Sequence, residues 1–238
     1  MDIYSTILIA MVIIFIGAFV QTAIGFGLAV VAAPLLFIVY PDYVPGPIFI
    51  SSLIISLLNA LKFRENIEIG GLKIAVIARI PGSILGGILL LYASTAHLSL
   101  WLGVLVLLAL AISLLPFRIE PTPTRMACAG ALSGFMGTSS GIGGPPMALL
   151  LQHQEANTLR GNLSAFFLCS AIISIIVLIF IGHFTLHHLL ISLPLLPATW
   201  AGYRFALFSM KYIAKEWIRY SALLLCFISG LGAIYQGL

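Results

Sequence analysis

Apolar residues run through nearly the whole chain and are interrupted only briefly. Ten apolar stretches are delimited by glycine, proline or charged residues: 4–22, 26–40, 45–62, 71–92, 98–116, 125–138, 144–153, 160–182, 186–204 and 215–235. A helix needs about 20 apolar residues to span a bilayer. The pattern therefore predicts an all-α polytopic membrane protein with 8 to 10 membrane segments and almost no domain outside the membrane.

Composition narrows the class of protein further. Of 238 residues, 61% are hydrophobic and 8% are charged, and the mean hydropathy is +1.18, whereas soluble domains are about 25% charged. This excludes a soluble enzyme and a disordered protein. The net charge of +4 comes from basic residues spread between the apolar stretches, so no nucleic-acid partner is expected. The N-terminus lacks a basic region, so we expect the first helix to be retained rather than cleaved as a signal peptide.

The chain repeats itself at a constant offset. Seven pairs of identical residues are 116 positions apart: Phe19 and Phe135, Thr22 and Thr138, Gly25 and Gly141, Gly27 and Gly143, Pro81 and Pro197, Gly86 and Gly202, and Trp101 and Trp217. Chance matches are common for Leu and Ile but not for Trp, Pro and paired Gly. The sequence therefore predicts two homologous halves, 1–118 and 119–238, that form one integrated membrane domain.

Positive charge suggests how the halves are oriented, because Lys and Arg mark cytoplasmic connections. The basic connections lie near 62–73, 116–125 and 204–219; they contain Lys62, Arg64, Lys73, Arg118, Arg125, Arg204, Lys211, Lys215 and Arg219. If each half has five segments, the halves are inverted, all three connections face the cytoplasm and both termini lie outside. If each half has four, one basic connection faces out. The charge distribution favours inverted repeats.

Two breaks between apolar stretches are glycine-rich rather than charged, at 21–27 and 137–146. Non-helical backbone at membrane depth must be buried or line a cavity, and paired breaks point to a transporter site. Helices that start after Gly25 and Gly143 would direct free N–H groups and positive dipole ends at an anion. Pro145 and Pro146 suit a first helical turn. The candidate binding residues are Gln21, Thr22, Gly25, Phe26, Gly27, Thr138, Ser139, Ser140, Gly141, Gly143 and Gly144.

The alternative interpretation is that the glycines only allow close helix packing. Gly82, Gly86, Gly130 and Gly134 fit that role well. The sequence also leaves open whether each break is a bend within one helix or the tip of a helical hairpin, which decides the number of crossings.

Three further polar residues lie in or beside apolar stretches. Arg79 lies well inside 71–92; it either pairs with an anionic substrate or extends toward Lys73 at the membrane surface. Asn59 either lines the same cavity or packs at the interface. Arg160 either attracts substrate or anchors its helix at the interface.

Other candidate chemistry is weaker. His183 and His187 lack a nearby acidic or cysteine ligand, so we expect no metal site. Cys128, Cys169 and Cys226 are scattered and predict neither a disulfide framework nor a metal motif. Glu155 either carries a coupled proton or is a solvated loop charge.

These motifs together resemble the sulfite exporter TauE/SafE family of membrane permeases. The resemblance runs through essentially the whole chain and is carried by Gly17, Gly25-Phe26-Gly27, Pro34-Leu35-Leu36, Gly134, the run 141–146, the run 156–162 and the run 195–202. It implies transport of small, often sulfur-containing anions such as sulfite, thiosulfate, sulfoacetate or related sulfonates. It also implies a bacterial or archaeal inner membrane and an ion gradient as the energy source.

The sequence thus predicts a secondary transporter, not an enzyme, that works by alternating access. A passive anion channel is the alternative. An intramembrane serine hydrolase at Ser140 with His183 or His187 is disfavoured, because Thr138 stands where such proteases carry glycine. We expect no cofactor. A coupled proton or sodium ion and a homodimer stay open.

Overall fold

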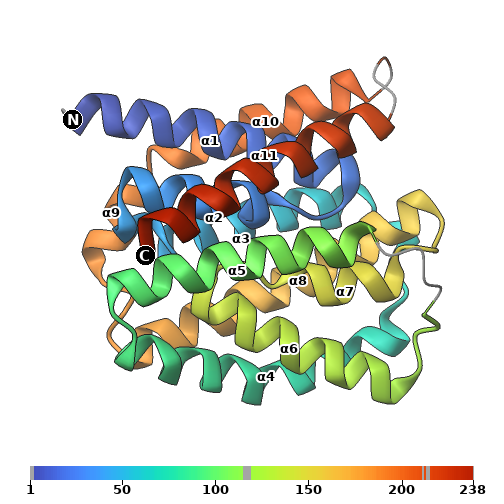
Figure 1. Ribbon diagram of the computed structural model, residues 1–238. Helices are drawn as coiled ribbons and strands as arrows, with labels where there is room; N and C mark the ends of the chain where they lie inside the picture. The colour runs from blue at the N-terminus through green and yellow to red at the C-terminus, as the bar shows by residue number, and fades with distance from the viewer. Residues whose placement is uncertain (1–2, 115–118, 211, 213–214, 238) are drawn as a thin grey trace.

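The computed structural model is a bundle of helices that lie roughly side by side (Figure 1). It describes residues 3–114, 119–210, 212 and 215–237. The helices are α1 Ile3–Ile24, α2 Leu28–Val39, α3 Gly46–Lys62, α4 Ile69–Tyr92, α5 Thr95–Leu114, α6 Pro123–Ser140, α7 Gly144–Leu151, α8 Ala156–Phe180, α9 Leu186–Ser192, α10 Leu195–Ser209 and α11 Lys215–Gly237, with 3-10 turns η1 Pro41–Tyr43 and η2 Arg64–Asn66. The described residues contain no strand, which confirms the all-α prediction.

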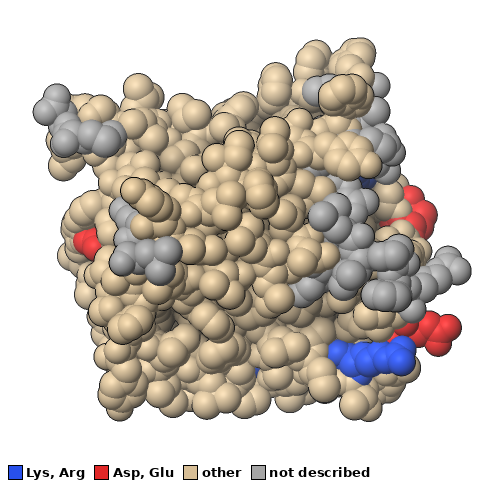
Figure 2. Space-filling model, viewed as in Figure 1, with Lys and Arg blue, Asp and Glu red and all other residues tan. Residues whose placement is uncertain are grey.

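The outer surface is that of a membrane protein. The face seen in Figure 2 carries its charged residues at its edges, and side chains without charge cover the area between. Within the part of the chain that the structure describes, four helical stretches are long and apolar enough to span a bilayer: Ile3–Ile24, Pro41–Lys62, Gly70–Tyr92 and Ala156–Phe180. Shorter apolar helices cover 28–39, 95–111 and 220–235. The larger number of 8 to 10 segments stays a prediction.

Both glycine-rich breaks reverse the direction of the chain. A Cβ atom on Gly17 of α1 would lie 3.0 Å from the carbonyl oxygen of Leu28, the first residue of α2. In the second half, a Cβ atom on Gly143 would lie 2.7 Å from the carbonyl oxygen of Ser133 in α6. Each break is therefore the tip of a helical hairpin. The chain turns through positive φ at Gly25 (+108°), Gly27 (+122°) and Gly141 (+83°), a conformation that residues with a Cβ avoid.

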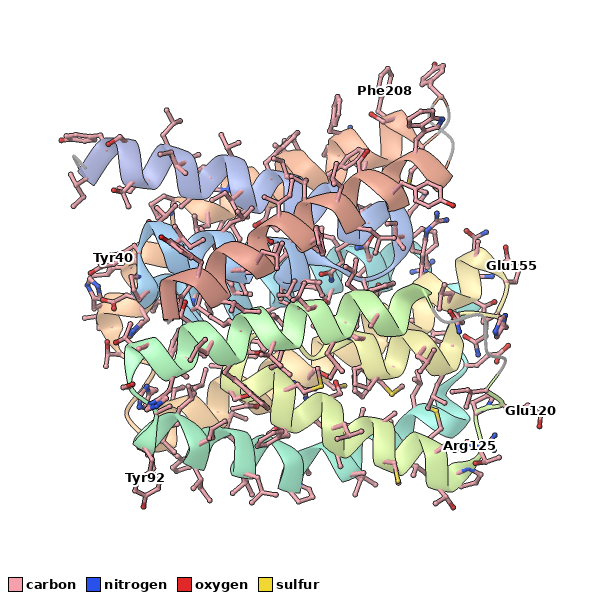
Figure 3. The ribbon with its side chains drawn as sticks, in the orientation of Figure 1. Tyr40, Tyr92, Glu120, Arg125, Glu155 and Phe208 are labelled. Carbon is pink, nitrogen blue, oxygen red and sulfur yellow. The ribbon has the colours of Figure 1, made fainter. Side chains whose placement is uncertain are left out.

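The connections gather at two ends of the bundle. Both termini lie at the end that holds Tyr40 and Tyr92, whereas Glu120, Arg125 and Glu155 lie at the other (Figures 1 and 3). The connection after α3 also reaches that second end, because the Glu68 N–H donates to the Asn162 side-chain oxygen at 2.7 Å. Phe208, near the end of α10, lies there too (Figure 3).

Of the basic residues in these connections, Arg118 and Lys211 lie outside the described residues, and the five-segment arrangement stays a prediction. Which end faces the cytoplasm stays a prediction.

Two close helix seams support the bundle. In one, α4 packs along α6, and a Cβ atom on Gly86 would lie 2.4 Å from the Phe135 carbonyl oxygen. In the other, α10 packs along α1, and a Cβ atom on Gly202 would lie 2.5 Å from the Phe15 carbonyl oxygen. Gly86 and Gly202 are one of the pairs 116 positions apart. The two seams are therefore reciprocal, as homologous halves would be, while the duplication and its boundary near residue 118 stay predictions.

One expected element is divided. The apolar stretch 186–204 forms two helices, α9 and α10, which are separated at Leu193 and Pro194. Proline has no N–H to donate to the preceding turn, so helical hydrogen bonding lapses there. The expectation of one uninterrupted segment was wrong at this position.

Candidate functional site

A small cavity lies where the two hairpin tips approach each other. Its volume is about 30 Å³, enough for a water molecule or two. Gly27, Ala29 and Val30 line it from the first hairpin, and Gly141, Gly143 and Gly144 line it from the second. The remaining lining residues are Gln21, Phe49, Ser52, Arg79, Phe167, Ser170 and Ala171. Six residues predicted from the sequence thus meet here: Gln21, Gly27, Arg79, Gly141, Gly143 and Gly144.

Arg79 is the only charged residue of this lining and is 1% exposed. It projects from α4 across the start of the second hairpin. Its Nη1 donates to the Ser133 hydroxyl at 2.8 Å, and its Nη2 donates to the Ser174 hydroxyl at 3.0 Å. The guanidinium also lies 5.7 Å from the centroid of the Phe166 ring. These contacts hold the group inside the bundle, so Arg79 does not extend to the membrane surface.

The Arg79 charge has no protein counter-charge. Among the described residues, no carboxylate lies within ion-pair distance of Arg79, and the Nε of Arg79 has no hydrogen-bond partner. Burying an unpaired charge costs several kcal/mol, and hydroxyls compensate for only part of this cost. An anion in the adjoining cavity would supply the missing charge.

The Arg79 contacts tie the guanidinium to the second hairpin. The Ser133 hydroxyl donates in turn to the Gly143 carbonyl, and the Ser174 hydroxyl is hydrogen-bonded to Thr138 at 2.9 Å. Thr138 therefore supports Arg79 through Ser174 and is absent from the cavity lining. A shift of the second break would therefore also move the Arg79 guanidinium.

Backbone donors come unequally from the two hairpins. The first N–H groups of a helix have no acceptor within the helix, and α2 places two first-turn residues, Ala29 and Val30, in the cavity lining. In α7, Pro145 and Pro146 carry no N–H, so Gly144 supplies the donor. The positive ends of both helix dipoles point to the same region, but α2 offers more hydrogen bonds.

The polar residues of the first break form a neutral cluster beside the cavity. Gln21 Nε2 donates to the Ser56 hydroxyl at 3.3 Å, and Asn59 Nδ2 donates to the Thr22 hydroxyl at 3.4 Å. All four side chains are buried. Of these, Gln21 lines the cavity, whereas Thr22 and Asn59 do not.

Two other predicted residues, Ser139 and Ser140, form hydrogen bonds to nearby backbone carbonyls. The Ser140 hydroxyl donates to the Met136 carbonyl at 2.6 Å, and the Ser139 hydroxyl donates to the Phe135 carbonyl at 2.7 Å. Ser139 also accepts a hydrogen bond from the Trp101 indole at 3.0 Å. Both serines thus satisfy the end of α6 and do not line the cavity.

Arg160 is attached to the first break. Its Nε and Nη2 donate to the Ala23 carbonyl at 3.2 and 2.6 Å, and its guanidinium lies 5.8 Å from the Phe63 ring centroid. A cation at a helix C-terminus stabilises the helix dipole. Gly25 packs directly against Arg160, since a Cβ atom there would lie 3.6 Å from the Arg160 Cα. Phe26 lines a second, larger cavity next to Gly27.

Sequence reasoning missed the serines that surround Arg79. Ser133 and Ser174 bind the guanidinium, and the hydroxyl of Ser170 is buried without a partner at the cavity wall. The available signal was the four-residue spacing of Ser170 and Ser174, which places both on one face of a helix otherwise rich in Ile, Leu and Phe.

The fold and the site are those of a polytopic helical membrane protein in which two glycine-rich hairpins enclose a buried, positively charged cavity. A family model described as Sulfite exporter TauE/SafE matches residues 9–233. The chain therefore belongs to the TauE/SafE family, which is a family of membrane transporters rather than enzymes. Comparison with curated proteins and with solved structures gave no match.

Proposed function

We propose that the protein is a secondary active transporter for a small, sulfur-containing oxyanion, such as sulfite, thiosulfate, sulfoacetate or a related sulfonate. The anion binds between the hairpin tips, where the cavity of about 30 Å³ has to widen to admit it, and the transporter works in the cytoplasmic (inner) membrane. The observation that carries this proposal is Arg79, a buried cation without a carboxylate partner at the point where both breaks meet. Family membership supplies the substrate class.

The chemistry of the cavity suits an oxyanion. Arg79 supplies a full charge and a donor with no protein partner at Nε. The N–H groups at the start of α2 and the hydroxyls of Ser52 and Ser170 supply neutral donors. Several moderate hydrogen bonds hold the anion without making release slow, which a transporter requires.

Transport requires the cavity to open alternately to each side. We propose that the two halves move as inverted repeats around the site and that a proton or sodium gradient drives the movement. A passive channel would use the same site but would not exchange anions.

Counterflow in proteoliposomes tests the proposal. Vesicles loaded with unlabelled thiosulfate should accumulate external labelled thiosulfate transiently, because a carrier exchanges the two. Arg79→Gln should reduce this exchange at least about thirtyfold, the loss expected when one partner of a buried charge interaction is removed, and Arg79→Lys should retain part of it. Thermal stability should stay equal or rise, since an unpaired buried charge is removed.

A control uses the equivalent position in the second half. Leu195 stands 116 residues after Arg79 and is fully buried, and Leu195→Met should leave counterflow unchanged. Full exchange in Arg79→Gln would refute the site. Flux down a gradient without counterflow would indicate a channel.

A further inference from the structure

A second, larger cavity adjoins the proposed anion site. Its volume is about 200 Å³. It lies among α1, α2, α5, α7 and α11, and its walls include Val30, Leu110, Ala148 and Ala222. Apart from Gln152 and the Cys226 thiol, the side chains that line it are hydrocarbon. An apolar cavity of about 150 Å³ is already large enough to bind benzene, so this one can hold a short alkyl or aryl group.

The apolar cavity and the anion cavity meet at the hairpin tips. Gly27 and Val30 line both of them, so the two cavities lie on either side of these two residues. Phe26 and Pro145 form the adjacent wall of the apolar cavity. A Cβ atom on Gly144, which lines the anion cavity, would lie 3.6 Å from the Phe26 ring. A polar and an apolar cavity therefore lie next to each other at the hairpin tips, with Gly27 and Val30 in the wall that they share.

Hydrocarbon walls do not suit a bare oxyanion, because removing an anion from water without hydrogen bonds costs many kcal/mol. They do suit the non-polar part of an organic anion, whose burial contributes about 0.8 kcal/mol per methylene. The charged head of such a molecule would lie with Arg79, and its tail would pass Gly27.

We propose that the apolar cavity is a substrate subsite that binds the non-polar group of an organosulfonate whose sulfonate occupies the Arg79 cavity. This inference rests on the proposed function. It specifies an amphiphilic substrate, so that the protein favours sulfonates with a short alkyl or aryl group over inorganic sulfite or thiosulfate.

The test is inhibition of thiosulfate counterflow by the series from methanesulfonate to pentanesulfonate. The half-inhibitory concentration should fall about fourfold for each added methylene until the cavity is filled. Two variants fill the cavity from different helices, Leu110→Trp on α5 and Ala222→Phe on α11. Each should remove the dependence on chain length while methanesulfonate still inhibits.

The matched control is Leu108→Trp on α5, because Leu108 is 47% exposed on the outer surface of the bundle and does not line the cavity. It should keep the full dependence on chain length. A chain-length effect that survives both filling variants would show that the tails only partition into the bilayer, and would overturn the inference.

The other outcomes separate the two proposals. If thiosulfate exchanges but all sulfonates inhibit equally, the subsite is wrong and the proposed function stands. If no counterflow occurs with any anion, the proposed function itself fails.

Discussion

The two hairpins share a backbone design and differ in chemistry. Each ends a long helix at a glycine with positive φ, at Gly25 and Gly141, and each returns as a shorter helix that packs on the first. Around the second hairpin, Arg79 brings a charge that is bound by serine hydroxyls. Around the first, amides pair with hydroxyls, and the Arg160 guanidinium donates to the Ala23 carbonyl and does not line the cavity.

In the predicted duplication, the offset of 116 residues identifies where the two halves differ. Arg79 corresponds to Leu195, Ser133 to Gly17 and Ser174 to Leu58. All three members of the charged cluster are therefore matched by apolar or side-chain-free residues in the other half. The two hairpins can therefore share a backbone geometry although only one half supplies the charge at the cavity, because a single small anion needs only one guanidinium.

Gln21 and Gly137, which are 116 positions apart, show this difference at one position. A Cβ atom on Gly137 would lie 2.7 Å from Arg79 Nη2, so glycine leaves the space that the guanidinium fills. Gln21 occupies the equivalent position in the first half, where no arginine enters. Gly137→Ala should lower anion affinity about tenfold, because the methyl group displaces Nη2 and weakens its bond to Ser174. Isothermal titration with thiosulfate measures this loss.

The control for that variant is Gly70→Ala near the start of α4, where a Cβ atom would meet nothing within 4 Å. Its affinity should match that of the unmodified protein. Because the atom displaced by Gly137→Ala is the end of a flexible side chain, thermal stability should change little. Unchanged affinity would mean that the guanidinium does not bind the anion from its position in the structure.

The fold was predictable where the signal lay in residues with distinctive backbone roles. Paired glycines and prolines located both breaks, and Gly82 and Gly130 were rightly linked to close packing, since Cβ atoms there would lie 2.0 and 2.1 Å from backbone oxygens. Hydropathy alone did not decide between a bend and a hairpin, because both give the same apolar pattern. That choice depends on the contact between Gly17 and Leu28, which is tertiary.

The candidate site was predictable only in part, for a physical reason. Glycines and a buried arginine are conspicuous in an apolar sequence, but the direction of a hydroxyl is not. Ser139 and Ser140 end a helix and bond to its carbonyls, whereas Ser133 and Ser174 bind Arg79. Which of these hydroxyls faces Arg79 depends on how each helix is rotated about its axis, and that rotation is not evident from a single sequence.

Arg160 offers a way to disturb the first hairpin without touching the charged one. Arg160→Met should free the Ala23 carbonyl, and amide hydrogen exchange over residues 23–28 should accelerate about tenfold, since hydrogen bonds to charged groups contribute about 1.5–3 kcal/mol. Mass spectrometry of exchanged peptides measures this. Anion affinity should fall less than about threefold, because Arg160 does not line the cavity.

Arg204→Met is the matched control, since Arg204 is exposed and contacts Trp200 at 5.9 Å. It should leave exchange over residues 23–28 unchanged. A loss of anion affinity in Arg160→Met as large as that in Arg79→Gln would instead place Arg160 in the binding site, as one interpretation of the sequence held.

The smallest predicted effect concerns the paired tryptophans. Trp101 donates to Ser139 and packs edge-on against Phe135 at 5.7 Å, whereas Trp217, 116 residues later, is 73% exposed. Trp101→Phe should keep the ring packing and lose one hydrogen bond, worth about 1 kcal/mol. The apparent melting temperature should then fall by about 2–4 °C.

Trp217→Phe, in contrast, should leave the melting temperature unchanged. Anion affinity should be unaffected in both variants, because Ser139 retains its own bond to the Phe135 carbonyl and does not line the cavity. A tenfold loss of affinity in Trp101→Phe alone would show that the second hairpin transmits the orientation of Ser139 to the anion. The residues that influence anion binding would then include Ser139 on α6 and Trp101 on α5 as well as Arg79 on α4, and the difference between the two halves would extend beyond Arg79.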